Sequence, residues 1–231
     1  MNSDYSMHAP VPVSMSSVEE RADFISKTYM HLFGAMIGFV LFEAAIFQTE
    51  LPAIMTSMLG GNWLIVLGGF MLVSWFANRT AMNATSVASQ YGALVAFVVA
   101  WGIMFVPMLY IAQMTAPGVI ESAATVTLLG FAGLTAVAFM TRKDFSFMGG
   151  MLRWIGIVAI VAIVGSLIFG FELGTYFSIG MIAFAGAAIL YDTSNVLHHY
   201  PEDKYVAAAL SLFASVALMF WYVLRLFMAR D

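Results

Sequence analysis

Seven long apolar stretches follow one another along this chain, with short connections between them. A run of about 20 apolar residues can cross the roughly 30 Å hydrocarbon core of a membrane as a helix. The stretches therefore predict an all-α integral membrane protein, a seven-transmembrane-helix bundle. The predicted spans are residues 28–47, 63–78, 91–112, 123–140, 152–171, 175–191 and 206–227.

The composition agrees with a membrane protein. Of the 231 residues, 62% are hydrophobic and 10% are charged, whereas soluble domains have roughly 45–50% and about 25%. A soluble fold of this composition has too few polar residues to cover its surface, so the lipid bilayer is the expected surrounding. The chain has no basic patch for nucleic acid. It has no cysteine for a disulfide or a thiolate metal site, and no metal or cofactor is expected.

The lysine and arginine residues favour one side of the membrane. Seven of the nine lie in the N-terminal tail or in connections on the same side, and only Arg225 and Arg230 depart from this pattern. Cytoplasmic connections carry the excess of positive charge, so we expect the N-terminus in the cytoplasm. With seven full spans the C-terminus lies outside; a re-entrant last segment would return it to the cytoplasm. Residues 1–26 are expected to form a disordered or weakly ordered cytoplasmic tail, and 27–231 the transmembrane domain.

Two ionisable residues lie deep within predicted spans. Glu43 is about 15 residues into the first span and Arg225 about 19 residues into the last. Each costs at least about 2.5–3.5 kcal/mol on insertion scales. Since both helices start on the same side, the two groups reach similar depths, and a Glu43–Arg225 ion pair is one hypothesis. The alternative is that Glu43 is protonated and Arg225 extends to the headgroups.

Further polar candidates lie near the predicted cytoplasmic side. Asp192 ends the sixth span, where an acidic residue is often simply solvated. His198 and His199 follow in the connection and are candidate pH sensors, because imidazole ordinarily changes charge near neutral pH. Adjacent loop histidines are more often only exposed. No lysine lies mid-span, no histidine lies at mid-membrane depth and no phosphate-binding motif occurs, so an enzyme is not expected.

Four short motifs occur in order in the C-terminal half. Residues 141–146 read Thr-Arg-Lys-Asp-Phe-Ser and are followed by Gly149 and Gly150; residues 191–193 read Tyr-Asp-Thr. Residues 209–212 read Ala-Leu-Ser-Leu, and 224–226 read Leu-Arg-Leu. Together these motifs resemble the Bax inhibitor-1 family, in its bacterial type. The match covers about residues 135–227, and the earlier spans agree mainly in number and spacing.

The resemblance implies a bundle with the last helix at its centre, in a bacterial inner membrane. It also implies a cation leak, notably of calcium, associated with ion homeostasis and suppression of cell death. In the family, a carboxylate on the sixth helix and one on the seventh form a pH-sensitive latch by sharing a proton. Asp192 matches the first carboxylate, but Ser215 stands at the second position and Leu218 at that of a usual asparagine. A serine can hydrogen-bond Asp192 but cannot share a proton with it.

Two functions therefore remain open. The first is a calcium leak pathway, with Asp192 and Ser215 as pore or gate residues at the cytoplasmic end. The alternative is a non-conducting scaffold or regulator that binds other membrane proteins. The replacement of an aspartate and an asparagine by Ser215 and Leu218 makes the last helix more apolar and favours the alternative. For the same reason we expect only weak pH gating, with any residual response arising from His198 or His199.

Overall fold

A computed structural model of the chain describes residues 12–59, 63–83 and 86–229. Within these residues, seven helices are long and apolar enough to cross a membrane, which confirms the predicted all-α fold. A short additional helix, α2 (Leu51–Leu59), joins the first two spans and packs on the third. The seven long helices are α1 (Val18–Ile46), α3 (Trp63–Asn83), α4 (Val87–Thr115), α5 (Val119–Thr141), α6 (Met148–Phe169), α7 (Thr175–His198) and α8 (Tyr205–Met228).

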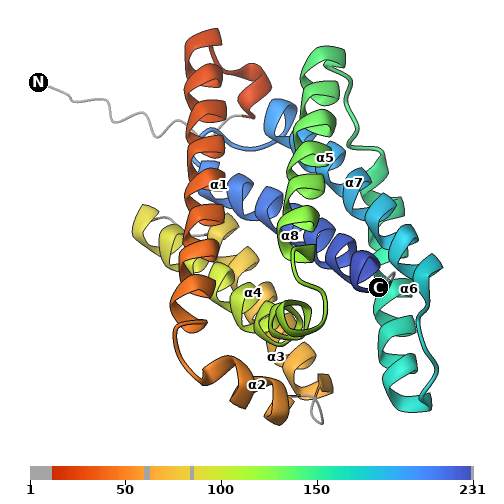
Figure 1. Cartoon of the computed structure of the whole chain (residues 1–231). Coiled ribbons are helices and arrows are strands. Elements are labelled where there is room, and N and C mark those ends of the chain that lie inside the picture. Colours follow the sequence, from red (N-terminus) through yellow and green to blue (C-terminus); the bar gives the residue numbers. More distant parts are fainter. Residues whose placement is uncertain (1–11, 60–62, 84–85, 230–231) are drawn as a thin grey trace, which may run out of the picture.

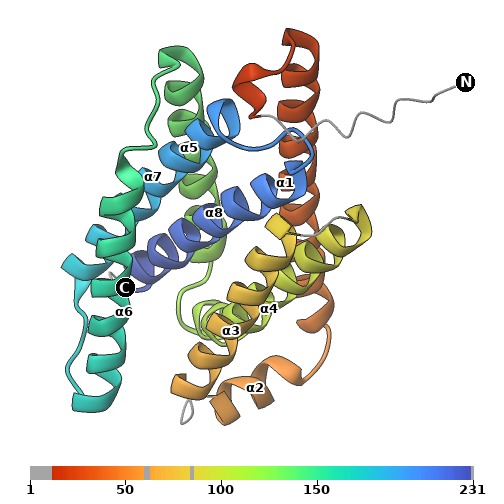
Figure 2. The ribbon, with the colours of Figure 1, turned by 180° about the vertical axis from the view of Figure 1, so that it is seen from behind.

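Helix α8 lies at the centre of the bundle. It packs against α1, α3, α4, α5 and α7, and it runs obliquely from beside α1 towards α6 (Figures 1 and 2). In its most apolar 18-residue window 72% of the residues are buried, against 11% in the peripheral helix α6. A helix that is apolar on all sides can be enclosed by others without stranding polar groups, which explains its central place.

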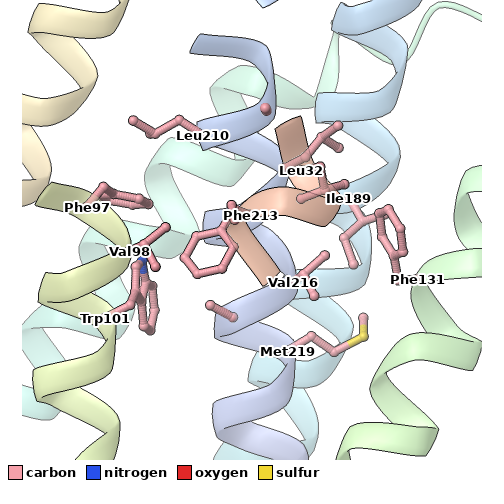
Figure 3. Packing of buried hydrophobic residues seen from close by; sticks show 14 of the residues in the cluster. Leu32, Phe97, Val98, Trp101, Phe131, Ile189, Leu210, Phe213, Val216 and Met219 are labelled. Carbon is pink, nitrogen blue, oxygen red and sulfur yellow. The ribbon is translucent and has the colours of Figure 1, made fainter. Parts of the chain in front are cut away.

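Aromatic rings fill the centre of the bundle. The Phe213 ring on α8 lies 6.2 Å from the Phe97 ring on α4, and the same distance from Phe39 on α1. Figure 3 shows Phe213 pointing from α8 towards Phe97 and the neighbouring residues of α4. About two turns further along α4 and α8, Phe105 stacks on Phe220 with ring centroids 5.2 Å apart. These contacts fix α8 against α1 and α4 through rings packed at van der Waals distance.

The N-terminal boundary of the transmembrane domain differs from the prediction. Helix α1 begins at Val18, and residues 13–15 form a 3-10 turn in which Val13 is fully buried. A capping box begins the helix: Ser17 accepts from the Glu20 backbone N–H, and the Glu20 carboxylate accepts from the Ser17 backbone N–H. The expected weakly ordered tail over residues 1–26 is therefore wrong for residues 12–26. Residues 1–11 lie outside the described part of the chain.

Candidate functional site

Asp192 and Ser215 meet where α7 packs on α8. The Ser215 hydroxyl donates a hydrogen bond of 2.5 Å to Oδ2 of Asp192. Ser215 is buried, and Asp192 is partly buried on the facing side of α7. The structure thus brings together the two residues that the sequence singled out as gate candidates. The Ser215 hydroxyl thus donates to the Asp192 carboxylate at the position where the resemblance described above implies a second carboxylate.

Tyr200 lies beside this pair and links it to the loop between α7 and α8. Its hydroxyl is 2.9 Å from the Ser211 hydroxyl, one turn before Ser215 on α8. Burial, with the nearby Asp192 carboxylate, raises the pKa of the Tyr200 hydroxyl. The hydroxyl therefore stays protonated at neutral pH and can act as a hydrogen-bond donor next to the acid. Nothing in the local sequence marked Tyr200 as part of the site.

The N-terminal segment closes over this loop. The Val13 backbone N–H donates to the Tyr200 carbonyl at 2.9 Å, and Pro12 pairs with Pro201 in an isolated antiparallel bridge. The Ser16 hydroxyl donates to a Glu202 carboxylate oxygen at 3.0 Å. These contacts attach residues 12–16 to the end of the bundle that holds Asp192. The segment predicted to be a loose tail is thus part of the wall around the candidate site.

A second polar cluster joins the α5–α6 connection to the end of α7. The buried Ser194 hydroxyl accepts from the Phe145 backbone N–H at 2.8 Å. Asp144 accepts from the Ser146 backbone N–H at 2.8 Å, and its other oxygen lies 2.9 Å from Nε2 of His199. The Thr-Arg-Lys-Asp-Phe-Ser motif therefore fixes the α5–α6 connection against the end of α7. Sequence reasoning missed Ser194, because its partner, the Phe145 backbone N–H, is 49 residues away in the sequence.

The two candidate pH sensors have different surroundings. His199 is exposed and makes the contact to Asp144. His198 is partly buried, with its Nδ1 atom 2.9 Å from the Ser194 carbonyl. His198 thus contacts α7 itself, and His199 contacts the α5–α6 connection. Their part in pH sensing stays a prediction.

Two of the family-like motifs touch each other directly. A methyl group placed at Gly149, near the start of α6, would lie 2.9 Å from the hydroxyl oxygen of Tyr191. The Tyr191 ring therefore lies against the glycine backbone, and a larger residue at position 149 would require the ring to shift. The same substitution at Gly150 meets nothing within 4 Å. Tyr191 precedes Asp192, so this contact helps fix the helix turn that carries the acid.

The predicted Glu43–Arg225 ion pair is not formed. Arg225 Nη2 donates instead to the Leu173 carbonyl, in the loop before α7, at 2.7 Å. Glu43 is 7% exposed, and neither of its carboxylate oxygens has a hydrogen-bond partner among the described residues. Helix α1 ends beside α2 whereas α8 ends beside α6, so similar depths do not bring the two side chains together (Figures 1 and 2).

We expect Asp144 to make stability depend on acid pH. The Ser146 backbone N–H, with smaller contributions from the Ser146 and His199 side chains, lowers the pKa of Asp144 to about 2. In the unfolded chain the pKa of an aspartate is near 4, so a lower pKa in the folded protein stabilises the fold above about pH 4. This stabilisation is lost as the pH falls towards 2. Melting temperatures in detergent should show wild type exceeding Asp144→Asn at neutral pH, with the difference shrinking across this window.

The His199→Ala variant serves as the control for this measurement. Because the Ser146 backbone makes the largest contribution to the lowered pKa, His199→Ala should keep most of the acid dependence. A difference between wild type and Asp144→Asn that stays constant down to about pH 2 would contradict the assignment.

At the contact between α7 and α8, Asp192 is paired with the hydroxyl of Ser215. Within the described residues, no three His, Cys, Asp or Glu side chains form a group that could hold a metal. Asp192 can hold one proton, or accept the hydrogen bond from Ser215, at the contact between α7 and α8. It has no second acid at Ser215 to take part in a shared-proton pair.

Comparison with known proteins places these features in context. A family model described as "Inhibitor of apoptosis-promoting Bax1" matches residues 21–231. An uncharacterised protein of Pseudomonas aeruginosa is 33% identical over 171 residues, 72% of this chain and 74% of the relative. The Escherichia coli protein named modulator of FtsH protease YccA is 30% identical over 172 residues, 73% and 76% of the two chains. Bax inhibitor 1 of Schizosaccharomyces pombe is 32% identical over 114 residues, 47% and 41%.

Proposed function

Because this chain belongs to the Bax inhibitor-1 family, we propose that it modulates a membrane-bound protease of the FtsH type. On this proposal it acts by binding within the bilayer and is neither an enzyme nor a calcium channel. The similarity to YccA supports the choice, since that relative is named a modulator of FtsH protease and is matched over three quarters of its length. A related chain in another Escherichia coli strain is named an inner membrane protein, which supports a bacterial inner membrane.

The hydrogen bond between Ser215 and Asp192 is the observation that carries the proposal. A latch of two carboxylates opens when the shared proton leaves and like charges repel. Here a neutral hydroxyl donates to the single acid, so loss of a proton creates no repulsion between α7 and α8. The aromatic packing around Phe213 and Phe105 adds further apolar contact along α8. Both features favour a binding protein over a gated cation pathway.

Isolation of the complex tests this proposal. The tagged chain and the Escherichia coli FtsH protease are produced together, extracted in mild detergent and purified through the tag. We expect the protease to be recovered with this chain and not with an unrelated seven-helix protein carrying the same tag. Equal recovery with both tagged proteins would argue against the proposal.

A calcium leak is the second candidate, because Asp192 still places a carboxylate at the contact between α7 and the central helix. Calcium flux into proteoliposomes across a pH series distinguishes the two functions. The binding proposal predicts flux near that of empty liposomes at every pH. Substantial flux that disappears in Asp192→Asn would favour the leak and identify Asp192 as its gate.

The orientation of the chain also stays a prediction with a direct test. The excess of lysine and arginine on one side of the predicted spans favours a cytoplasmic N-terminus. A reporter fused near residue 146 should therefore behave as cytoplasmic, and one near residue 116 as external. The opposite pattern would overturn the predicted orientation and place Asp192 towards the outer side of the membrane.

A further inference from the structure

A cavity of about 930 Å³ lies between α1 and α5, with α8 behind it. Figure 1 shows α1 and α5 standing apart, with α8 crossing behind the space between them. Residues from all three helices, and from the end of α4, line the cavity. Its volume is within the range of about 300–1,000 Å³ that is usual for small-molecule sites. Exposed lining residues such as Phe33, Ile37 and Leu128 mark its lipid-facing side.

The lining of the cavity is mostly apolar. Most of the side chains that line it are aliphatic or aromatic; Phe105, Phe213 and Phe220 are examples. Glu43, Gln113, Glu121 and Thr127 supply the polar lining. Among the described residues that line the cavity, none is lysine, arginine or histidine. The ionisable side chains of the lining, Glu43 and Glu121, are therefore both acidic.

Glu43 is the group that lacks a partner in this cavity. The side chain is 93% buried, and neither carboxylate oxygen meets a donor among the residues that the structure describes. The Thr127 hydroxyl, on the facing helix α5, is 2% exposed and likewise has no partner within the described chain. Buried polar groups are nearly always hydrogen-bonded, because an unmade bond costs about 1–3 kcal/mol. An ionised carboxylate can only accept hydrogen bonds, whereas the Thr127 hydroxyl can donate or accept. The Glu43 carboxylate without a partner therefore indicates a missing donor in this wall.

The backbone of α4 makes room for this acid. A side chain at Gly102 would overlap the Phe42 ring and come within 3.4 Å of Oε1 of Glu43. The glycine thus allows α1 to approach α4 closely while the carboxylate remains in the wall of the cavity. Any side chain at position 102 would require the Phe42 ring, next to Glu43, to shift.

We propose that this cavity binds a single-chain lipophilic ammonium compound that enters from the bilayer. Its ammonium group donates to Glu43, and its hydrocarbon tail lies along the aromatic face of α8. An ammonium has three donors and no acceptor, which suits a wall that has acceptors and no cation. An anionic head group would lie beside Glu43 and Glu121 and is disfavoured. A neutral head group forms no charge-assisted hydrogen bond with Glu43. This site is separate from Asp192 and does not depend on the proposed protease modulation.

Photolabelling in lipid nanodiscs tests the site. The protein is placed in phosphatidylcholine nanodiscs with a dodecylammonium probe that carries a diazirine on its tail. Dodecyl sulfate and dodecanol probes with the same photoreactive tail serve for comparison. We expect the ammonium probe to label cavity residues of α1, α5 and α8, with at least about tenfold lower labelling by the other two probes. The labelled peptides are identified by mass spectrometry.

Variants separate the head group from the tail. Glu43→Gln should weaken ammonium labelling at least about tenfold, since it removes a charge-assisted bond. Glu121→Gln makes the same change at an exposed residue of the cavity edge and should alter labelling less than about threefold. Ala124→Trp fills the cavity from α5 and should abolish labelling while Glu43 stays intact. Equal labelling by all three probes, or unchanged labelling in Glu43→Gln, would overturn the proposal and leave only an acyl-chain crevice.

Discussion

Replacement of Ser215 by aspartate is expected to make the stability of the bundle depend on pH. The new carboxylate would lie beside Asp192, where the serine hydroxyl now donates at 2.5 Å. Two unit charges about 4 Å apart repel by about 4 kcal/mol at an effective dielectric constant near 20. While the pair holds one shared proton this repulsion is absent, and it appears when that proton is lost. The melting temperature of Ser215→Asp in detergent should therefore fall as the pH rises from about 5 to 9.

Two variants control for this effect. Ser215→Asn has nearly the shape of the aspartate but no charge, so it should show no comparable decline. Adding Asp192→Asn to Ser215→Asp removes the second charge and should abolish the decline. The same pH profile in Ser215→Asp and Ser215→Asn would mean that the two positions do not face each other.

Substitution of Gly102 by alanine is expected to destabilise the contact between α1 and α4. The added methyl group would overlap the Phe42 ring, and overpacking of this kind costs about 1–3 kcal/mol. Because Phe42 precedes Glu43, displacement of its ring would also disturb the cavity wall. The expected result is a clear fall in melting temperature, measured on purified protein in detergent.

Gly92 provides a matched control on the same helix. A methyl group there meets nothing within 4 Å, and alanine favours a helix over glycine by up to about 1 kcal/mol. Gly92→Ala should therefore be neutral or slightly stabilising. If both alanine variants lose stability equally, the loss comes from the helix itself and not from Phe42.

The seven spans could be predicted because each is a long apolar run bounded by short polar connections. The start of α1 was missed because residues 1–20 are rich in serine, methionine and proline, a composition typical of a disordered tail. The signal was nevertheless present, since serine followed three residues later by glutamate is a capping box. Helix α2 was missed because a nine-residue segment that also contains Thr56 and Ser57 is too short to resemble a span.

The site was predictable only in part. The contact between Asp192 and Ser215 followed from motif positions on adjacent helices, and the hydrogen bond has the donor and acceptor expected. The predicted Glu43–Arg225 ion pair was wrong because depth in the membrane does not determine how far apart two helices lie within its plane. Arg225 instead donates a hydrogen bond to the Leu173 carbonyl in the loop before α7. Tyr200 and Ser194 depend on long-range contacts that sequence spacing does not encode.

Proteolysis in a reconstituted membrane tests the central claim most directly. Purified Escherichia coli FtsH and a membrane-embedded substrate are placed in liposomes with this chain or with an unrelated seven-helix protein. The rate of substrate loss with ATP is then followed by gel. The account predicts slower degradation with this chain, increasing with its ratio to the protease. Equal rates with both proteins at every ratio would contradict the claim that the chain modulates this class of protease.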